Sequence, residues 1–279
     1  MGRRAAILAA AIGLAGLVGG GTAPGATARF AGLAAADSPD VSSNWAGYAT
    51  VAPPDTNMSF TDVTATWRQP KGTCTANRGD AAVFWVGLGG MASDSQSLEQ
   101  LGTEIDCRRA GAPPRYSAWW ELIPAPPVTI PIKVAAGDMI GAALLVNGQT
   151  LTFSMRDITR HRRFTKRMTV SQALDLTSAE WIAEAPSLCS SANECRVVPL
   201  TRFGSVTFTN AAVTADAHTG TIADPTWSAT PIELISGRDS GHFFGGGDPL
   251  GPGVGAVPGA LGADGRSFTV TWQRSVAPP

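Results

Sequence analysis

Hydrophobic and polar residues alternate in short runs along most of the chain, and no convincing helical period lasts beyond about ten residues. The runs are rich in Val, Thr, Phe and Trp, and turn residues such as Asn147-Gly148 separate them. These features are typical of strands. The clearest runs are 44–51, 60–67, 82–88, 116–123, 128–134, 139–146, 150–157, 205–215 and 267–274. The pattern predicts an all-β sandwich or barrel in one domain, with 171–177 the one candidate for a turn of helix.

The first 28 residues have the organisation of a secretory signal peptide. Arg3 and Arg4 precede an apolar run over 5–18, and small residues up to Ala28 provide a cleavage site. The run is too short to favour a membrane span. We therefore expect a secreted, extracellular protein that has no membrane attachment after cleavage.

Composition changes again at two later places in the chain. Residues 29–41 are small and turn-prone, which indicates a linker or a short pro-segment before a domain at 42–279. Residues 236–265 are rich in Gly and Pro, and we expect them to form a long loop before the last strand.

The charge of the chain is almost balanced. Without the signal peptide, 19 Lys and Arg face 22 Asp and Glu, a net charge of −3. No basic stripe is evident in this balance, so nucleic acid is not an expected partner. We expect a monomer.

Four cysteines in an exported chain favour disulfides. Cys189 and Cys195 lie in one short polar segment, so we pair them, which leaves Cys74 to pair with Cys107. A four-cysteine metal site is the rival interpretation, but no C-x-x-C spacing supports it. The three histidines share no ligand spacing either, so neither a metal nor a cofactor is expected.

Carboxylates, an amide and tryptophans fall on matching faces of several predicted strands. Glu180 and Glu184 have the same parity on one strand, and Trp85, Gln100 and Glu121 lie on three others. Such a face suits a carbohydrate site with two acids, or a peptide groove in which one carboxylate activates water. A third interpretation, solvated strand faces with the tryptophans in the core, stays open on composition alone.

Five segments, in order, resemble the glutamic peptidases (eqolisins), above all their actinobacterial members. They are "SNWAGY" at 43–48, "FWVGLGG" at 84–90, "LEQLGTEID" at 98–106, "YSAWWELIPAPP" at 116–127 and "SAEWIAEAPS" at 178–187. Any one segment is weak, whereas all five in order within an exported all-β chain are specific. The resemblance implies a sandwich of two curved antiparallel sheets, similar to concanavalin A-like or jelly-roll folds.

The resemblance also implies the catalytic residues. The family's glutamine segment aligns with 98–102 and gives Gln100, and its A-E-[aromatic]-I-x-E pattern aligns with 179–184 and gives Glu184. Glu180 is then a neighbour that adjusts the pKa of Glu184 by its like charge.

Further positions carry over from the same family. Trp85, Trp119 and Glu121 match residues of its substrate groove. Three positions depart from the fungal members: Gly89 and Ser117 stand where those members have aspartate, and Ile123 stands where they have tyrosine. Side-chain preference and pH optimum are therefore expected to differ from the fungal enzymes.

The implied function is a secreted acid endopeptidase. Glu184 acts as general base on water, Gln100 stabilises the oxyanion, and no cofactor is required. The alternative is a β-sandwich glycoside hydrolase, or a carbohydrate-binding module, that uses the same face.

Overall fold

The computed structural model describes residues 6–8, 39–77, 79–92, 95–191, 194–235 and 254–274. Within these ranges every regular element is a β-strand, so the prediction of an all-β fold is confirmed and the turn of helix expected at 171–177 is wrong. No helix in this part of the chain is long and apolar enough to cross a membrane.

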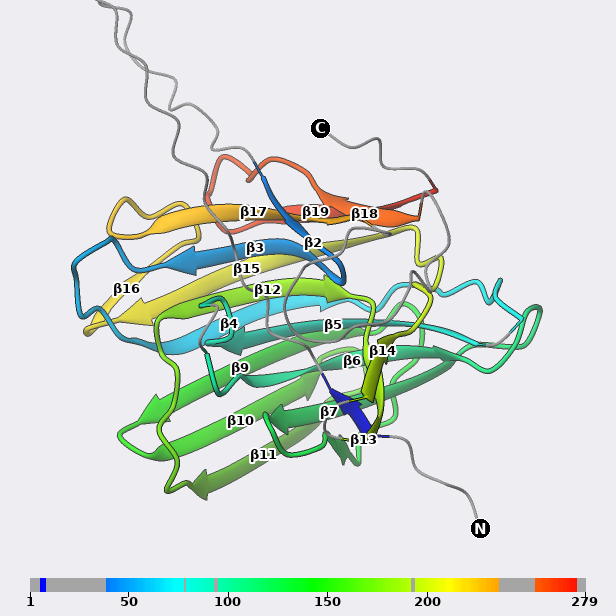
Figure 1. Cartoon of the computed structure of the whole chain (residues 1–279), viewed down its shortest axis with the longest axis horizontal. Helices are drawn as coiled ribbons and strands as arrows, with labels where there is room; N and C mark the ends of the chain where they lie inside the picture. The colour runs from blue at the N-terminus through cyan, green and yellow to red at the C-terminus, as the bar shows by residue number, and fades with distance from the viewer. Residues whose placement is uncertain are drawn as a thin grey trace, which may run out of the picture.

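One sheet of sixteen strands folds back on itself and forms two stacked halves (Figure 1). The first half runs in the order β17 (Ser228–Ile235), β3 (Trp45–Val51), β12 (Ser178–Glu184), β5 (Asp80–Leu88), β6 (Glu99–Cys107), β7 (Arg115–Leu122) and β8 (Val128–Ile130). The second runs in the order β11 (Arg162–Thr169), β10 (Thr150–Asp157), β9 (Met139–Asn147), β4 (Phe60–Arg68), β15 (Ser205–Ala215), β19 (Phe268–Gln273) and β18 (Gly255–Pro258). Pairing of β17 with β18 joins the halves, β16 (His218–Gly220) pairs with β15, and β2 (Asp40–Ser42) pairs with β17.

The main core lies between the two halves, where β4 contacts β5 and β12, and β9 contacts β5 and β6. Strands of the second half alternate buried and exposed positions, because only one of their faces meets this core. Large buried residues from both halves fill it, among them Trp67, Phe84, Phe153, Trp181 and Phe208.

In the first half, β5 and β12 are buried at every position. The face of β12 that holds Trp181 packs on the main core, whereas Ile182 packs in a second apolar cluster on the opposite face. Strands covered on both faces lose the alternating pattern of exposure. Carboxylates on these strands are therefore buried rather than half-exposed.

The predicted disulfide between Cys74 and Cys107 is confirmed, and it ties the segment before β5 to the end of β6. The backbones of Cys189 and Cys195 lie opposite each other in the pairing of β13 (Ser187–Ser191) with β14 (Glu194–Val197). Their side chains lie outside the part of the structure that is described, so the second disulfide stays a prediction.

Two segments bear on the expected domain boundaries. Within the predicted 236–265 loop, residues 236–253 lie outside the described residues, but Gly255–Pro258 form β18. The expected single loop is therefore wrong at its C-terminal end. Near the N-terminus, β1 (Ala6–Leu8) lies within the predicted signal peptide and pairs with β13, and β2 begins at Asp40, inside the predicted linker.

Candidate active site

The face of β3, β12, β5, β6 and β7 that points away from the main core is called the site face. Strand pairing brings the expected site residues together on it, in rows across β12, β5, β6 and β7. These strands are neighbours in the sheet (Figure 1). One row contains Glu180, Gly87, Gln100 and Glu121. Facing residues of antiparallel strands project to the same side, so these side chains share one face, as the sequence predicts.

Two further rows follow along the same strands. The middle row contains Ile182, Trp85, Gly102 and Trp119. The third row contains Glu184, Val83, Glu104 and Ser117. Gln100 and Glu184 thus share the face but are not directly opposite, because four residues along β12, or about 13 Å, separate their rows.

Glu184 is the best-anchored carboxyl on this face. It is fully buried, and each of its oxygens accepts one hydrogen bond: Oε2 from Trp85 Nε1 at 2.8 Å, and Oε1 from Asn44 Nδ2 at 3.1 Å. Burial raises the pKa of Glu184 to about 8, while the hydrogen bonds from Trp85 and Asn44 oppose the rise. Two N–H donors on two oxygens suit an ionised carboxylate, which only accepts.

Asn44 has a role that the sequence analysis missed, although it lies within the "SNWAGY" segment. Its position is fixed by Ser42, whose Oγ accepts from the backbone N–H groups of both Asn44 and Trp45. The Asn44 carbonyl also accepts from the backbone N–H of Ala185, directly after the catalytic candidate Glu184. A buried polar residue immediately before an apolar strand was the available signal.

Gln100 is fully buried and is held from one side. Its Nε2 donates to Glu121 Oε2 at 2.8 Å, so Glu121 orients the Gln100 amide. No described residue donates to Gln100 Oε1. A buried carbonyl oxygen without a partner is available to a water molecule or to a substrate N–H.

Glu180 faces Gln100 across Gly87, at a backbone distance of about 10 Å for two strand spacings. Its oxygens accept no hydrogen bond from the described residues. Burial raises the pKa of Glu180 well above its usual value, and the like charges of Asp175 and Glu99 add to the rise, while the nearby Ser178 hydroxyl opposes it. Burial therefore favours the protonated form of Glu180.

The expectation that Glu180 adjusts the pKa of Glu184 is wrong. Burial and hydrogen bonds from neighbouring side chains set the pKa of Glu184, and Glu180 does not contribute. The distance of about 13 Å along the strand explains this, because a like charge acts strongly only within about 4–6 Å.

Trp85 spans the gap between the rows of Gln100 and Glu184. Its indole nitrogen donates to Glu184, while Cζ3 lies 2.9 Å from where a Cβ on Gly87 would be. That same position is 3.2 Å from Gln100 Cβ. Gly87 is therefore required for the indole to lie between the two catalytic candidates.

Trp119 lies beyond Gly102 in the middle row and is 8% exposed. Its Nε1 has no hydrogen-bond partner among the described residues, so it can donate to a ligand carbonyl. Ile123, one of the three departures, packs at the margin of the same apolar cluster.

A second departure, Gly89, has a structural explanation. Its φ is +80°, and a Cβ there would lie 2.3 Å from the backbone oxygen of Asp175. Asp175 occupies this space and accepts from the Gly90 N–H and the Ser95 hydroxyl. Burial opposes ionisation of Asp175, but hydrogen bonds from Ser95, Thr177 and Gly90 lower its pKa. In this chain Asp175, from the segment before β12, fills the space beside Gly89.

The third departure, Ser117, donates from its Oγ to Glu104 Oε2 at 2.8 Å. Burial raises the pKa of Glu104 to about 7, the Ser117 hydrogen bond opposes this, and the charge of Asp106 adds to it. An aspartate at 117 would place a second acid against Glu104. Serine in its place leaves one carboxyl and one donor.

Comparisons with known proteins bear on the family and the fold. The sequence matches the profile described as the peptidase A4 family over residues 43–238. No curated protein matches the chain.

Several solved structures share the fold. Scytalido-glutamic peptidase, solved with a peptide-based transition-state analogue, has a TM-score of 0.63 and 22% identity over 82% of this chain and 98% of that chain. SCP-B, described as a member of the eqolisin family and solved with the tripeptide Ala-Ile-His, has a TM-score of 0.59 and 21% identity over the same shares. Aspergilloglutamic peptidase from Aspergillus niger has a TM-score of 0.52 and 25% identity over 69% of this chain and 99% of that chain.

Proposed function

The chain belongs to the peptidase A4 family, the glutamic peptidases, and on that premise we propose that this peptide hydrolase is a secreted endopeptidase with Gln100 and Glu184 as its catalytic pair. The observation that carries the proposal is the pair of N–H donors on Glu184, from Trp85 and Asn44. They favour the ionised form that a general base needs. Glu180, without such donors, is suited to remain protonated.

In the proposed reaction, ionised Glu184 takes a proton from a water molecule that attacks the scissile carbonyl carbon. The Gln100 amide donates from Nε2 to the developing oxyanion, and its Oε1 helps to hold the water. Glu184 then returns the proton to the leaving amine. Glu121 keeps the amide oriented, because its Oε2 takes one of the two N–H bonds of Nε2 and leaves the other for the substrate.

Trp85 and Trp119 are proposed to line the groove for an extended peptide. Trp85 lies in the row between those of Gln100 and Glu184, and its indole N–H donates to Glu184. The Trp119 indole N–H is placed to bind a peptide carbonyl. Substrates are therefore proteins or peptides, and secretion by way of residues 1–28 remains part of the proposal.

The pH range follows from the state of Glu184. A free glutamate has a pKa near 4.5, and burial raises that of Glu184 to about 8. Because the base must be ionised, the acid limb of the kcat/KM profile should lie above pH 4.5. Activity should therefore rise with pH between about 4.5 and 8, and the optimum should lie at a higher pH than an unshifted carboxylate would give.

The test is digestion of denatured casein by the processed protein over a pH series from 2 to 8. Cleavage should persist with EDTA, pepstatin and a serine-directed fluorophosphonate. A folded protein that leaves casein intact throughout and cleaves a β-glucan would instead support the glycoside hydrolase. Binding of either polymer without cleavage would support a binding module.

A further inference from the structure

The hairpin of β10 and β11, residues 150–169, has a high density of positive charge. It contains six of the chain's 21 Lys and Arg residues and a single acid, Asp157. The nearly balanced charge of the whole chain conceals this hairpin, and the expectation of no basic stripe is wrong here. β11 is also the last strand at one end of the sheet order (Figure 1).

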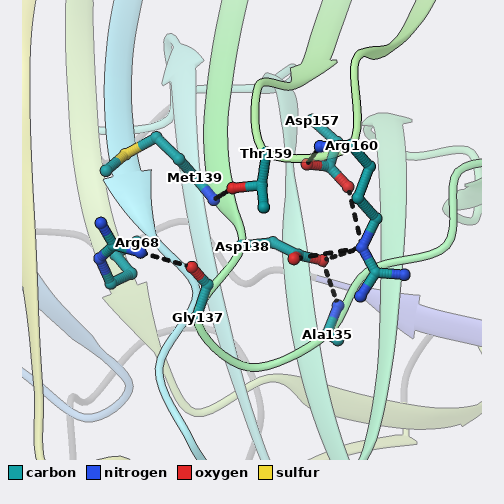
Figure 2. Close-up of polar contacts among 8 residues, drawn as sticks. All are labelled: Arg68, Ala135, Gly137, Asp138, Met139, Asp157, Thr159 and Arg160. Carbon is teal, nitrogen blue, oxygen red and sulfur yellow. Dashed lines mark hydrogen bonds and ion pairs between the residues drawn. The ribbon is translucent and has the colours of Figure 1, made fainter.

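One of these cations is already neutralised inside the protein. Arg160 Nε lies 3.0 Å from Asp138 Oδ2 and 3.6 Å from Asp157 Oδ2 (Figure 2). The other five form no ion pair with any described residue, and all are exposed: Arg156, Arg162, Arg163, Lys166 and Arg167. Arg160 is therefore structural, and the remaining cations are free for a ligand.

Arg156 and Arg163 are directly opposite each other in the pairing of β10 with β11. Like charges in facing positions destabilise a sheet, because their Cβ atoms lie only about 4.5–5.5 Å apart. Arg167 projects to the same face, two pairs farther along β11. Positive charges on an edge strand prevent pairing with other chains, but this protection does not require two arginines in a facing pair.

The same face continues across β9 and β4 to β15, away from the main core, and we call it the outer face. It contains a cavity of about 520 Å³ lined by Arg68 and Lys71 and by the hydroxyl side chains Ser205, Thr207 and Thr209. Arg68 is held there by a hydrogen bond from Nη1 to the Gly137 carbonyl at 2.6 Å (Figure 2).

Acidic groups are scarce on this surface. On β4, β9, β10 and β11, Asp62 is the one acid on the outer face, and it forms no ion pair with a described residue. Its pKa is raised by burial, with no opposing contribution from a cation. Five cations, Arg156, Arg163, Arg167, Arg68 and Lys71, thus share one face without counter-ions.

We propose that the outer face binds an acidic polysaccharide. The guanidinium group of arginine binds a carboxylate or sulfate group with two parallel hydrogen bonds. The cavity beside Arg68 and Lys71, which Pro70 and Met139 line together with the hydroxyl groups, suits an acidic sugar unit, with the rest of the polymer following the arginines toward β11. No aromatic side chain projects from the outer face of β4, β9, β10 or β11, so the stacking that single-stranded nucleic acids require is missing.

The outer face and the site face lie on opposite sides of the sandwich, so binding would tether the protein to a polyanionic matrix without obstructing catalysis. The inference does not depend on which residues are catalytic.

The experiment measures the affinity of the full chain for dextran sulfate and for polygalacturonate at fixed salt, with neutral dextran as the reference polymer. Both acidic polymers should bind, neutral dextran should not, and affinity should fall as salt is raised. The double variants Arg163→Gln/Arg167→Gln and Arg68→Gln/Lys71→Gln should each weaken binding about three- to tenfold, from two exposed charge contacts.

Arg108→Gln/Arg109→Gln is the matched control, because it removes two exposed arginines from the turn after β6 and changes the net charge by the same amount. Its affinity should change less than twofold. Unchanged melting temperatures confirm that each variant folds. Equal losses in the control and in the outer-face variants would overturn the proposal, as would tighter binding of single-stranded DNA or of anionic lipid vesicles than of either polysaccharide.

Discussion

The site face and the outer face of the sandwich differ in the burial of their ionisable side chains. On the site face, Glu180 and Glu184 are fully buried, and no Lys, Arg or His pairs with them among the described residues. On the outer face, arginines such as Arg156 and Arg163 are exposed and lack acidic partners. Buried carboxyls respond by a raised pKa, which adjusts acid–base chemistry, whereas exposed guanidinium groups keep their charge and can attract a ligand.

The difference follows from what covers each half of the sheet. Strands of the first half have apolar clusters on both faces, so a carboxyl there loses its hydration. Strands of the second half have solvent on one face. A titratable residue therefore acquires its function from the layer in which it lies, and the following predictions test this from the largest effect to the smallest.

Glu184→Gln should have the largest effect, because it removes the proposed general base. Loss of such a group typically lowers the rate by about 10²–10⁴. Glu180→Gln, the matched control on the same strand and the same face, should retain most activity, because burial favours the neutral form of Glu180 and Glu180 does not shift the pKa of Glu184. The measurement is kcat/KM from pH 3 to 8, with folding checked by circular dichroism.

The reverse result would assign the base to Glu180. Glu180 lies in the same row as Gln100, with Gly87 between them. An inactive Glu180→Gln and an active Glu184→Gln would show that this position in the row, and not the N–H donors on Glu184, determines which glutamate is the base.

Gln100→Ala is expected to lower kcat by about 10²–10³, the usual consequence of losing one oxyanion donor. Glu121→Gln should lower kcat less, because Gln100 loses its carboxyl partner but keeps its amide. Rates under saturating substrate separate this effect from binding. If Gln100→Ala raised KM and left kcat unchanged, Gln100 would be a substrate-binding residue and not a catalytic one.

Much of this arrangement could be predicted from the sequence. The alternation predicted the strands, and the shared parity of Glu180 and Glu184 predicted a common face with Trp85 and Gln100. The resemblance to glutamic peptidases is confirmed by the family match and the fold. Period-two patterns carry this information because they depend only on which side of a strand a residue occupies.

Other features could not be predicted, because they depend on contacts between segments far apart in the sequence. The hydrogen bond from Asn44 to Glu184 joins residues 140 positions apart. Occupation by Asp175 of the space beside Gly89 depends on how the segment before β12 packs. Likewise, the facing of Arg156 and Arg163 requires the register of β10 with β11.

Stability should fall as pH rises, a consequence of the buried acids. Burial raises the pKa of Glu99 and of Glu184 to about 8 and that of Glu180 well above its usual value. Below pH 4.5 these groups are protonated in both folded and unfolded chains and do not affect stability. Between pH 4.5 and about 8 only the unfolded chain ionises, so the free energy of unfolding falls, by at most about 1.4 kcal/mol per pH unit for each group.

Urea denaturation at pH 4.5, 6 and 8 measures this loss, which should be at most about 5 kcal/mol for each group. Glu180→Gln should reduce the slope, because it replaces one of the buried acids with a neutral amide. Arg163→Gln, a control on the outer face, should leave the slope unchanged. A free energy of unfolding that is constant from pH 4.5 to 8 would contradict the assignment of these carboxyls as buried and protonated.

The smallest effect concerns Glu104, which lies at the margin of the site face. It is partly exposed, and so it is intermediate between the buried carboxyls and the exposed side chains. Ser117→Ala removes the hydrogen bond to Glu104 Oε2 and should raise the pKa of Glu104 above its present value of about 7. Hydrogen bonds to an ionised acceptor are stronger than those to a neutral one. The variant should therefore lose about 1 kcal/mol of stability at pH 8 and less at pH 4.5. Ser117→Thr, which keeps the hydroxyl, should match the unmodified protein at both pH values. An equal loss at pH 4.5 and pH 8 would show that Ser117 contributes through packing, and that Glu104 behaves as an ordinary exposed acid rather than as a member of the buried set.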